Sequence, residues 1–276
     1  MPTELAPGNK RGLVLLSPLI AGSGAVGYAD SWPPGVSPDM FGAVVTGPVT
    51  LRAQRGEPPP RLAEITAGFA LAAGDHNPGY HRVLRDHDKA WRRLGVPVIV
   101  ALGQSHPEDW ARLAQHLEEE SAASGLELAL PQQVSRPEAG GWVAAVRRAC
   151  TLPLLAKVPG AQAEGLAEAC VESGADALVI GSGSPVVGRV AGVEGHGPEA
   201  IWIEGAAGGP ASFSLTLRAL RAVSALDLRV PLVAAGGITR LDDARRCLGE
   251  GALAVQVRSL CWVDPARVAA MAEALG

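Results

Sequence analysis

The sequence predicts a (β/α)8 barrel, or TIM barrel, from two observations. Eight short apolar runs rich in Val, Ile, Leu and Ala recur along the 276 residues, and segments of helical pattern separate them. The runs are continuously apolar rather than alternating, which is typical of parallel strands covered on both faces. Barrels of this class run to about 250 residues as one unit. We therefore expect a single barrel domain over residues 1–276.

The expected strands are short, and most begin after Pro or end at Gly or Ser. They lie at residues 18–24, 42–47, 97–103, 126–131, 153–159, 177–182, 231–237 and 254–257. The segment "PEDWARLAQHLEEESAASG" illustrates the helices between them, with an acidic first turn, an apolar stripe and Gly125 as a stop. Residues 55–61 and 194–210, rich in Pro and Gly, are expected to be the longest loop-like insertions.

A second fold remains open because of the stretch "GSGAVG" at residues 22–27. It matches the glycine pattern of a dinucleotide-binding turn in a doubly wound sheet. No regular strand-helix-strand unit follows, however, because residues 31–38 form a Pro-rich loop. The barrel is the better interpretation.

Composition excludes several classes of partner. The net charge is −4 and charged residues make up 19%, so no basic face or tract points to nucleic acid or a lipid surface. No apolar run approaches about 18 residues, and the N-terminus lacks a signal-peptide core. The four cysteines form no CxxC pair and the histidines show no metal-binding spacing. We expect a cytoplasmic protein with reduced thiols, a small-molecule substrate, and no nucleic acid, membrane or metal.

Candidate site residues gather where the expected strands end, since barrel active sites lie at the carboxyl ends of strands. Gly22, Ser23 and Gly24 let a flat ligand approach the backbone. Lys157 is one of three lysines against 21 arginines and stands inside an apolar strand, so it needs a partner or a pocket. It is interpreted as a flavin or anion contact, with a lysine snorkelling at the rim as the alternative.

Further candidates suit a phosphate group. Loops after the seventh and eighth barrel strands often hold phosphate through backbone N–H groups. The sequence offers Gly236 and Gly237 after one, and Arg258 and Ser259 after the other. A further Gly-rich loop at residues 205–211 includes Gly208 and Gly209. Together these loops predict a phosphorylated cofactor.

No catalytic base is evident. Asp75 and His76 could form a general-base pair, but side chains adjacent in sequence seldom face each other. His76 and His106 are interpreted as solvated or capping residues, and Asn77 as part of a turn with Pro78 and Gly79.

The chain resembles the soluble class of the dihydroorotate dehydrogenase family over residues 14–265. "SGAVGYA" is similar to the family's SGTFGYG, "GAVVTGPVTL" to AVVTKSVT, and "GFALAAGDHNPGY" to GMLNAIGLQNPG. "LLAKVPG" resembles VIVKLSPN, and "VPLVAAGGITRLDDARRCLGEGALAVQVRS" resembles PIIGxGGIxxxxDAxExxxAGAxAVQVGT. The order and spacing of these elements carry the resemblance.

The resemblance implies a flavoprotein that binds FMN and oxidises dihydroorotate to orotate in pyrimidine biosynthesis. It places Gly22, Ser23 and Gly24 by the isoalloxazine, Lys157 at its polar edge, Gly208 and Gly209 along the chain, and Gly236, Gly237, Arg258 and Ser259 around the phosphate. It also implies a homodimer, with a possible partner subunit.

The chain departs from the family at the substrate site. The family's proton-abstracting Cys or Ser lies in an SCPN loop, which "LALPQQV" lacks. Its orotate-binding asparagines correspond here to Leu71, Ala129, Gln132 (or Gln133) and Gly181. A second family lysine is Gly47, and the Gly of the family's GT pair is Arg258, which would clamp or obstruct the phosphate.

These departures leave three hypotheses. Lost amides cost about 1–3 kcal/mol each, and a lost base costs about 10²–10⁴ in rate. The first hypothesis is therefore an FMN-dependent oxidoreductase that acts on a CH–CH bond of another substrate. The second is a non-catalytic barrel acting as a partner or scaffold subunit. The third is a dihydroorotate dehydrogenase whose base is displaced to His76 or His106.

Overall fold

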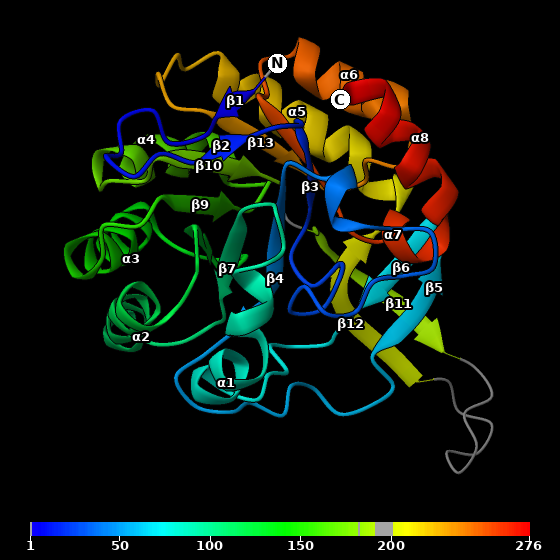
Figure 1. Ribbon diagram of the computed structural model, residues 1–276. Helices are drawn as coiled ribbons and strands as arrows, with labels where there is room; N and C mark the ends of the chain where they lie inside the picture. Colours follow the sequence, from blue (N-terminus) through cyan, green and yellow to red (C-terminus); the bar gives the residue numbers. More distant parts are fainter. Residues whose placement is uncertain (1, 182, 191–200) are drawn as a thin grey trace.

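The computed structural model describes residues 2–181, 183–190 and 201–276, and its centre is a closed barrel of eight parallel strands (Figure 1). Around the barrel the strands are β10 (Ala177–Ile180), β13 (Leu232–Ala235), β14 (Ala254–Val257), β3 (Leu19–Ala21), β4 (Ala43–Val49), β7 (Val98–Leu102), β8 (Gly125–Ala129) and β9 (Leu154–Val158). Pairing of β9 with β10 closes the ring. Each strand overlaps one of the eight apolar runs, which confirms the predicted barrel.

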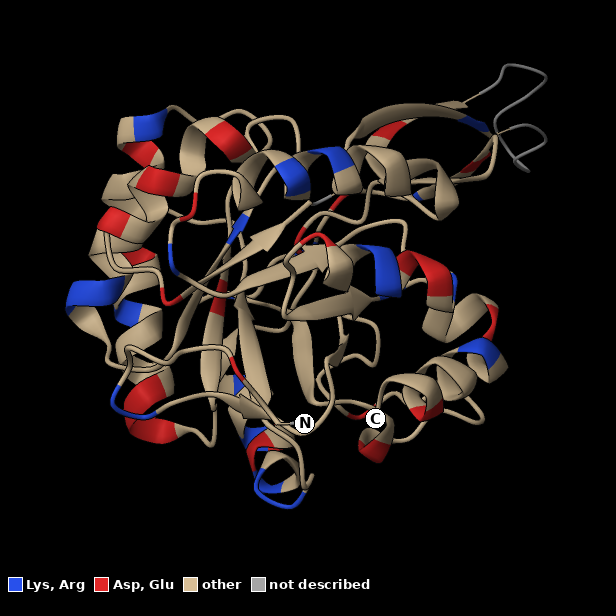
Figure 2. Ribbon diagram, turned by 90° about the horizontal axis from the view of Figure 1, so that it is seen from above, with Lys and Arg blue, Asp and Glu red and all other residues tan. Residues whose placement is uncertain are grey.

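Helices cover the outside of the barrel. They are α1 (Tyr80–Trp91), α2 (Pro107–Glu120), α3 (Arg136–Ala149), α4 (Ala163–Glu172), α5 (Phe213–Ser224), α6 (Leu241–Gly249), α7 (Leu260–Val263) and α8 (Pro265–Leu275). Helix α2 buries Trp110, Leu113 and Leu117, the apolar stripe that its sequence predicts. Lys, Arg, Asp and Glu residues are interspersed along these outer helices (Figure 2), which is the distribution expected of a solvated surface.

The connection between the first two barrel strands differs from the predicted alternation of strands and helices. Residues 22–42 contain only the 3-10 turn η1 (Pro38–Met40) and no α-helix. The prolines at 33, 34 and 38 explain this, because a proline removes a backbone donor and disfavours helix in the residue before it. The C-terminal helix α8 packs against β3 and η1 instead.

A second, antiparallel sheet lies over one end of the barrel and corrects the predicted loops. Its strands, in order, are β11 (Pro185–Val190), β12 (Ile201–Gly208), β6 (Gly68–Leu71) and β5 (Leu62–Ile65). Residues 55–61 do form a loop, as expected, but residues 201–208 of the second expected insertion are strand β12. Residues 194–200 of that insertion fall outside the described part. The small residues that suggested a loop are needed for pairing, since a Cβ on Gly205 would lie 2.5 Å from the Leu71 carbonyl carbon.

The opposite end of the barrel is closed by the N-terminal hairpin of β1 (Thr3–Glu4) and β2 (Val14–Leu15). Leu5, Leu13 and Leu15 are fully or almost fully buried, in one cluster with Ile20 and other side chains inside the barrel. This plug of apolar side chains leaves the carboxyl ends of the strands as the open end.

Candidate functional site

A cavity of about 600 Å³ lies at the carboxyl ends of the barrel strands, between the barrel and the antiparallel sheet. Its lining includes residues within or directly after all eight barrel strands, together with residues of β6 and β12. The volume falls within the range of about 300–1,000 Å³ typical of cofactor and substrate sites. All ten site residues expected from the sequence line this one cavity: Gly22, Ser23, Gly24, Lys157, Gly208, Gly209, Gly236, Gly237, Arg258 and Ser259.

The floor of the cavity holds an ion pair inside the barrel. The Lys157 Nζ atom lies 3.1 Å from Oε1 of Glu127 and donates to Oε1 of Gln256 at 2.9 Å. Nε2 of Gln256 donates to the other carboxylate oxygen of Glu127 at 2.5 Å. Glu127 is fully buried, whereas the Lys157 side chain keeps 14% exposure on the cavity side. An ammonium has three donors, so one remains for a ligand above the floor.

One wall is backbone that only glycine can form. Gly236 and Gly237 have φ angles of 122° and 71°, which lie in the left-handed region. A Cβ on Gly237 would collide with the backbone of Phe213 at the start of α5. This turn therefore lies at the cavity, next to the start of α5, and glycine turns beside a helix N-terminus are suited to an anion.

A cation stands beside that turn. The Arg258 side chain is exposed, lines the cavity, and forms no ion pair within the part of the chain that the structure describes. Its Cζ lies 5.8 Å from the centre of the Trp262 ring, and the indole Nε1 donates to the Ala25 carbonyl at 2.7 Å. Trp262 thus holds the guanidinium by a cation–π contact while leaving its N–H donors available.

On the opposite side, the turn after β6 presents Asp75 and His76 to the cavity. Oδ2 of Asp75 accepts a hydrogen bond from the backbone N–H of Gln104, directly after β7. Burial raises the pKa of Asp75 above its ordinary value, and the Gln104 hydrogen bond opposes part of that shift. His76 is exposed, and its Nδ1 lies 2.9 Å from the Arg55 carbonyl. His106 precedes α2 and does not line the cavity.

The wall that would face a substrate is poor in polar side chains. Leu71, Ala129, Gln132 and Gly181 all line the cavity, at the positions where the sequence comparison with the family places asparagines. Nε2 of Gln132 donates to the Gly183 carbonyl at 3.1 Å, whereas Gln133 lies outside the lining. The strand end at Ala129 therefore provides neither thiol nor hydroxyl.

Gly47, where the resemblance puts a lysine, is not itself a lining residue, but its Cα lies 3.8 Å from the Cβ position of the lining residue Gly24. Its N–H donates to the Gly27 carbonyl at 2.8 Å, and a Cβ would meet the Tyr28 ring at 3.5 Å. The Tyr28 hydroxyl donates to the Pro48 carbonyl, and burial raises the pKa of Tyr28 to about 12. Tyr28 is therefore a neutral donor at neutral pH.

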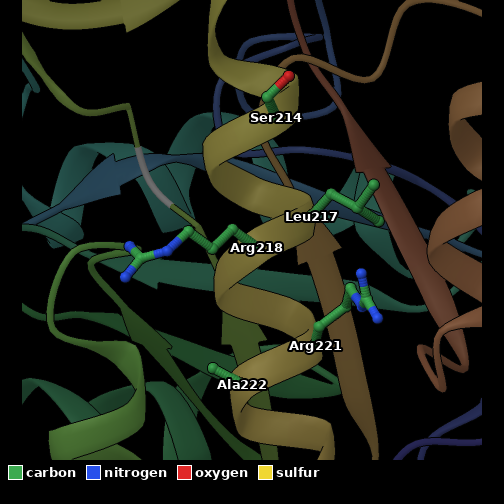
Figure 3. A pocket seen from close by; sticks show the side chains of 5 residues that line it. All are labelled: Ser214, Leu217, Arg218, Arg221 and Ala222. Atoms are coloured by element: carbon green, nitrogen blue, oxygen red, sulfur yellow. The ribbon is translucent and has the colours of Figure 1, made fainter.

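Other features of the described residues offer no competing site. The four cysteines are buried free thiols outside the cavity, and no metal-binding cluster of His, Cys, Asp and Glu is found in residues 2–181, 183–190 and 201–276. Within the same ranges no helix is long and apolar enough to cross a membrane. A second hollow lies along α5, and Figure 3 shows side chains that line it, among them Arg218 and Arg221. Arg221 is already paired with Glu250 at 3.2 Å.

Two residues of the floor escaped prediction from the sequence. Glu127 is a lone carboxylate in the apolar run "LELAL", and Gln256 a lone amide in "AVQV". Both carry the signal that marked Lys157, a polar group in a buried strand that needs a partner. Phe69, which packs against Gly208, had no such signal because its place depends on the antiparallel sheet.

Comparison with known proteins agrees with this geometry. The family model described as dihydroorotate dehydrogenase matches residues 9–276. The catalytic subunit of dihydroorotate dehydrogenase B (NAD(+)) from Pelobacter propionicus is 31% identical, over 97% of this chain and 91% of the relative. The subunit of the same name from Desulforudis audaxviator is 33% identical, over 96% and 89%. A crystal structure of DHODH from Eimeria tenella in complex with ferulenol has a TM-score of 0.76 at 18% identity, covering 95% of this chain and 81% of that one, which supports the fold.

Proposed function

Because the chain belongs to the dihydroorotate dehydrogenase family, we propose that it is an FMN-dependent oxidoreductase acting on a CH–CH bond of a small molecule. The observation that carries the proposal is one cavity that joins a glycine-lined anion cradle with an unpaired arginine to a buried lysine. A phosphate at one end and a polar ring edge at the other match these two features.

The residues present fit FMN. Gly236, Gly237 and Ser259, with Arg258, would hold the phosphate. Gly22, Ser23 and Gly24, which line the cavity, would lie against the ring. Lys157 would offer its remaining N–H to the polar edge of the ring, and Gly208 and Gly209 would follow the chain between ring and phosphate.

The bound flavin would supply two-electron redox chemistry. The protein would contribute orientation and charge. Glu127 and Gln256 hold the Lys157 ammonium in one position, so this donor is fixed before a ligand arrives. The antiparallel sheet covers the cavity with Phe69 and Leu71 and would limit access of water to the reacting carbons.

We propose that the substrate differs from dihydroorotate. Leu71, Ala129 and Gly181 offer no side-chain amide in the cavity wall. Each missing hydrogen bond to a buried polar ligand costs about 1–3 kcal/mol, and several are missing together. A less polar ring, or one with donors and acceptors placed differently, suits this wall better.

The test begins with the purified protein. We expect the protein to absorb at about 450 nm, where bound flavin absorbs, and to release FMN on denaturation. Protein with no flavin that also fails to bind added FMN would contradict the proposal. It would favour the non-catalytic alternative, as would copurification in a stoichiometric complex without turnover.

A second candidate function is oxidation of dihydroorotate itself. It is favoured by the printed names of relatives that match 97% and 96% of the chain. The rate at which dihydroorotate reduces the flavin under anaerobic conditions decides between the two candidates. If the substrate differs from dihydroorotate, this rate should be lower than that of a family member, because the hydrogen bonds to dihydroorotate are missing. Substitution of His76 by Ala then tests whether that histidine serves as the displaced base.

The same relatives bear on partners and location. They are named as catalytic subunits of an NAD(+) enzyme, so we propose that this chain passes electrons to a separate partner subunit. A homodimer and a cytoplasmic location complete the proposal. Size-exclusion chromatography with light scattering, alone and with cell extract, tests the assembly.

A further inference from the structure

The side of the cavity opposite Arg258 contains a carboxylate that no motif assigned. Asp75 lies in the turn between β6 and α1 and lines the cavity. In the family motif quoted above, the position that matches Asp75 of "GFALAAGDHNPGY" is an apolar Leu, so the resemblance assigns no role to this carboxylate.

The turn holds Asp75 in place from both sides. Its carbonyl accepts from Nδ2 of Asn77 at 2.7 Å, and Asn77 is itself buried at 2% exposure. Oδ1 of Asn77 accepts from the N–H of Gly79 and from Oγ1 of Thr50, both at 2.9 Å. The backbone that carries Asp75 is therefore fixed to the end of β4, as a positioned catalytic group requires.

One carboxylate oxygen is anchored and the other is free. Oδ2 accepts from the backbone N–H of Gln104, and a Cβ on Gly103 would come within 3.3 Å of this oxygen. Oδ1 has no hydrogen-bond partner and the carboxylate no ion pair among the described residues. A carboxylate with one anchored and one open oxygen retains a lone pair for an incoming proton.

Gln104 places this carboxylate next to the empty base position. Its side-chain Nε2 donates to the Ala129 carbonyl at 2.9 Å, at the end of β8 where the family's base loop would begin. One residue therefore touches both Asp75 and the strand end that lacks a thiol. The carboxylate and the missing base belong to the same side of the cavity.

The charges lining the cavity leave Asp75 without a neutralising partner. Lys157 is paired with Glu127, Arg258 lies by the phosphate cradle, and the exposed His76 is turned to the Arg55 carbonyl. Burial accordingly raises the pKa of Asp75, and no charged neighbour is among its causes. A carboxylate made more basic by burial is a better proton acceptor at neutral pH.

We propose that Asp75 is the proton acceptor of this active site, in place of the absent thiol or hydroxyl. The inference rests on the proposed function, which supplies an oxidant of the flavin class. One substrate C–H bond breaks and its proton moves to Oδ1 of Asp75. The neighbouring C–H bond gives up its hydrogen with both electrons to the flavin, and a C=C bond forms between the two carbons.

The first experiment needs no turnover. The carboxyl carbon of Asp75 is followed by ¹³C NMR from acidic to alkaline pH, in the FMN-bound protein with and without orotate as a planar probe. A pKa above the ordinary aspartate value and a resonance that shifts when orotate binds are expected. An ordinary pKa together with indifference to orotate would overturn the proposal.

The second experiment measures reduction of the bound flavin in a stopped-flow instrument, with dihydroorotate and dihydrouracil as probes. Dihydrouracil is included because it lacks the carboxylate that an ionised Asp75 would repel. Asp75→Asn should slow reduction by about 10²–10⁴-fold while the flavin absorbance is retained. Asp75→Glu should restore part of the rate. Asp86→Asn, on the solvent face of α1, should stay within about threefold of wild type.

The outcomes separate the two claims. Absence of flavin defeats the proposed function, whatever Asp75 does. Flavin-bound protein in which Asp75→Asn leaves the rate of flavin reduction near that of wild type overturns the assignment of Asp75 as base. An acidic limb in the pH profile of wild-type flavin reduction that disappears in Asp75→Asn supports it, since a purely structural carboxylate would not move that limb.

Discussion

The ammonium of Lys157 lies 3.1 Å from a carboxylate oxygen of Glu127, and the two side chains reach each other from adjacent strands inside the barrel. Burying this pair is costly, and removing one partner costs more, because the other charge then remains without compensation.

Lys157→Met should therefore lower the free energy of unfolding by about 3 kcal/mol, near the lower end for buried pairs because the cavity gives the lysine some access to water. Urea unfolding followed by far-UV circular dichroism measures the loss. The double variant Lys157→Met/Glu127→Gln should recover most of the stability but should not recover flavin binding. A double variant as unstable as the single one would refute this account of the pair.

Arg258 should distinguish FMN from riboflavin. The guanidinium is unpaired in the described structure, so its donors are available to a phosphate. Arg258→Ala should weaken FMN binding by about 10- to 100-fold, equivalent to one charge-assisted contact. Riboflavin, which has no phosphate, should bind both proteins alike. Quenching of flavin fluorescence gives both affinities, with Arg218→Ala on α5 as a control. Equal losses for the two flavins would show that Arg258 has no phosphate contact.

Two glycines should respond to alanine in opposite directions. Gly237 has φ 71°, and a Cβ there would meet the Phe213 backbone. Gly237→Ala should cost about 1–3 kcal/mol or more and reduce flavin retention. Gly141 lies within α3 with nothing within 4 Å of its Cβ position. Gly141→Ala should stabilise by about 0.5–1 kcal/mol, because alanine has the higher helix propensity. Thermal and urea unfolding report both changes.

The four cysteine thiols should be inert in the native protein. Burial raises the pKa of Cys150 and Cys261 to about 11 and that of Cys170 and Cys247 to about 12. At neutral pH almost no thiolate exists, and the buried sulfurs are also inaccessible. The reagent DTNB should label none within minutes, and all four after unfolding in guanidinium. Rapid labelling of one native thiol would show that its surroundings open.

Asp75 should make stability depend on pH. Its folded-state pKa is raised, so the unfolded chain loses this proton first as the pH rises, and ionisation then favours unfolding. The contribution of the carboxyl is thus most favourable below the ordinary aspartate pKa of about 3.9 and declines as the pH passes up through the raised value. Asp75→Asn should consequently be more stable than wild type at pH 7 and close to it in acid. A stability difference that does not change with pH would exclude this titration.

The barrel was readable from the sequence because each of its strands is buried on both faces. A run such as "PVIVALG" around β7 is apolar at every position, as expected of a strand covered on both faces, and Pro and Gly mark its ends. The antiparallel sheet was not readable, because β12 consists of "IWIEGAAG". Its small residues are typical of a loop in the sequence, whereas in the structure they allow the close approach of β6.

The candidate site was predictable where a polar residue stands in an otherwise apolar strand. Lys157 is such a residue, and the glycine pairs at strand ends follow from the barrel geometry. Asp75 could not be placed in this way, because sequence alone does not tell which of the loop side chains at the cavity is anchored to a neighbouring strand end. The hydrogen bond from the Gln104 N–H to Oδ2 of Asp75 shows that Asp75 is the anchored one.

The sheet above the cavity joins two pieces of chain that are remote in sequence, since Leu71 of β6 pairs with Ala206 of β12. Neither piece can form this edge alone, so the enclosure is completed only when the later segment has left the ribosome and returned to the earlier one. A nascent chain with half of its barrel strands therefore lacks this enclosure, so a prosthetic group held in the cavity would be loaded at the end of biosynthesis.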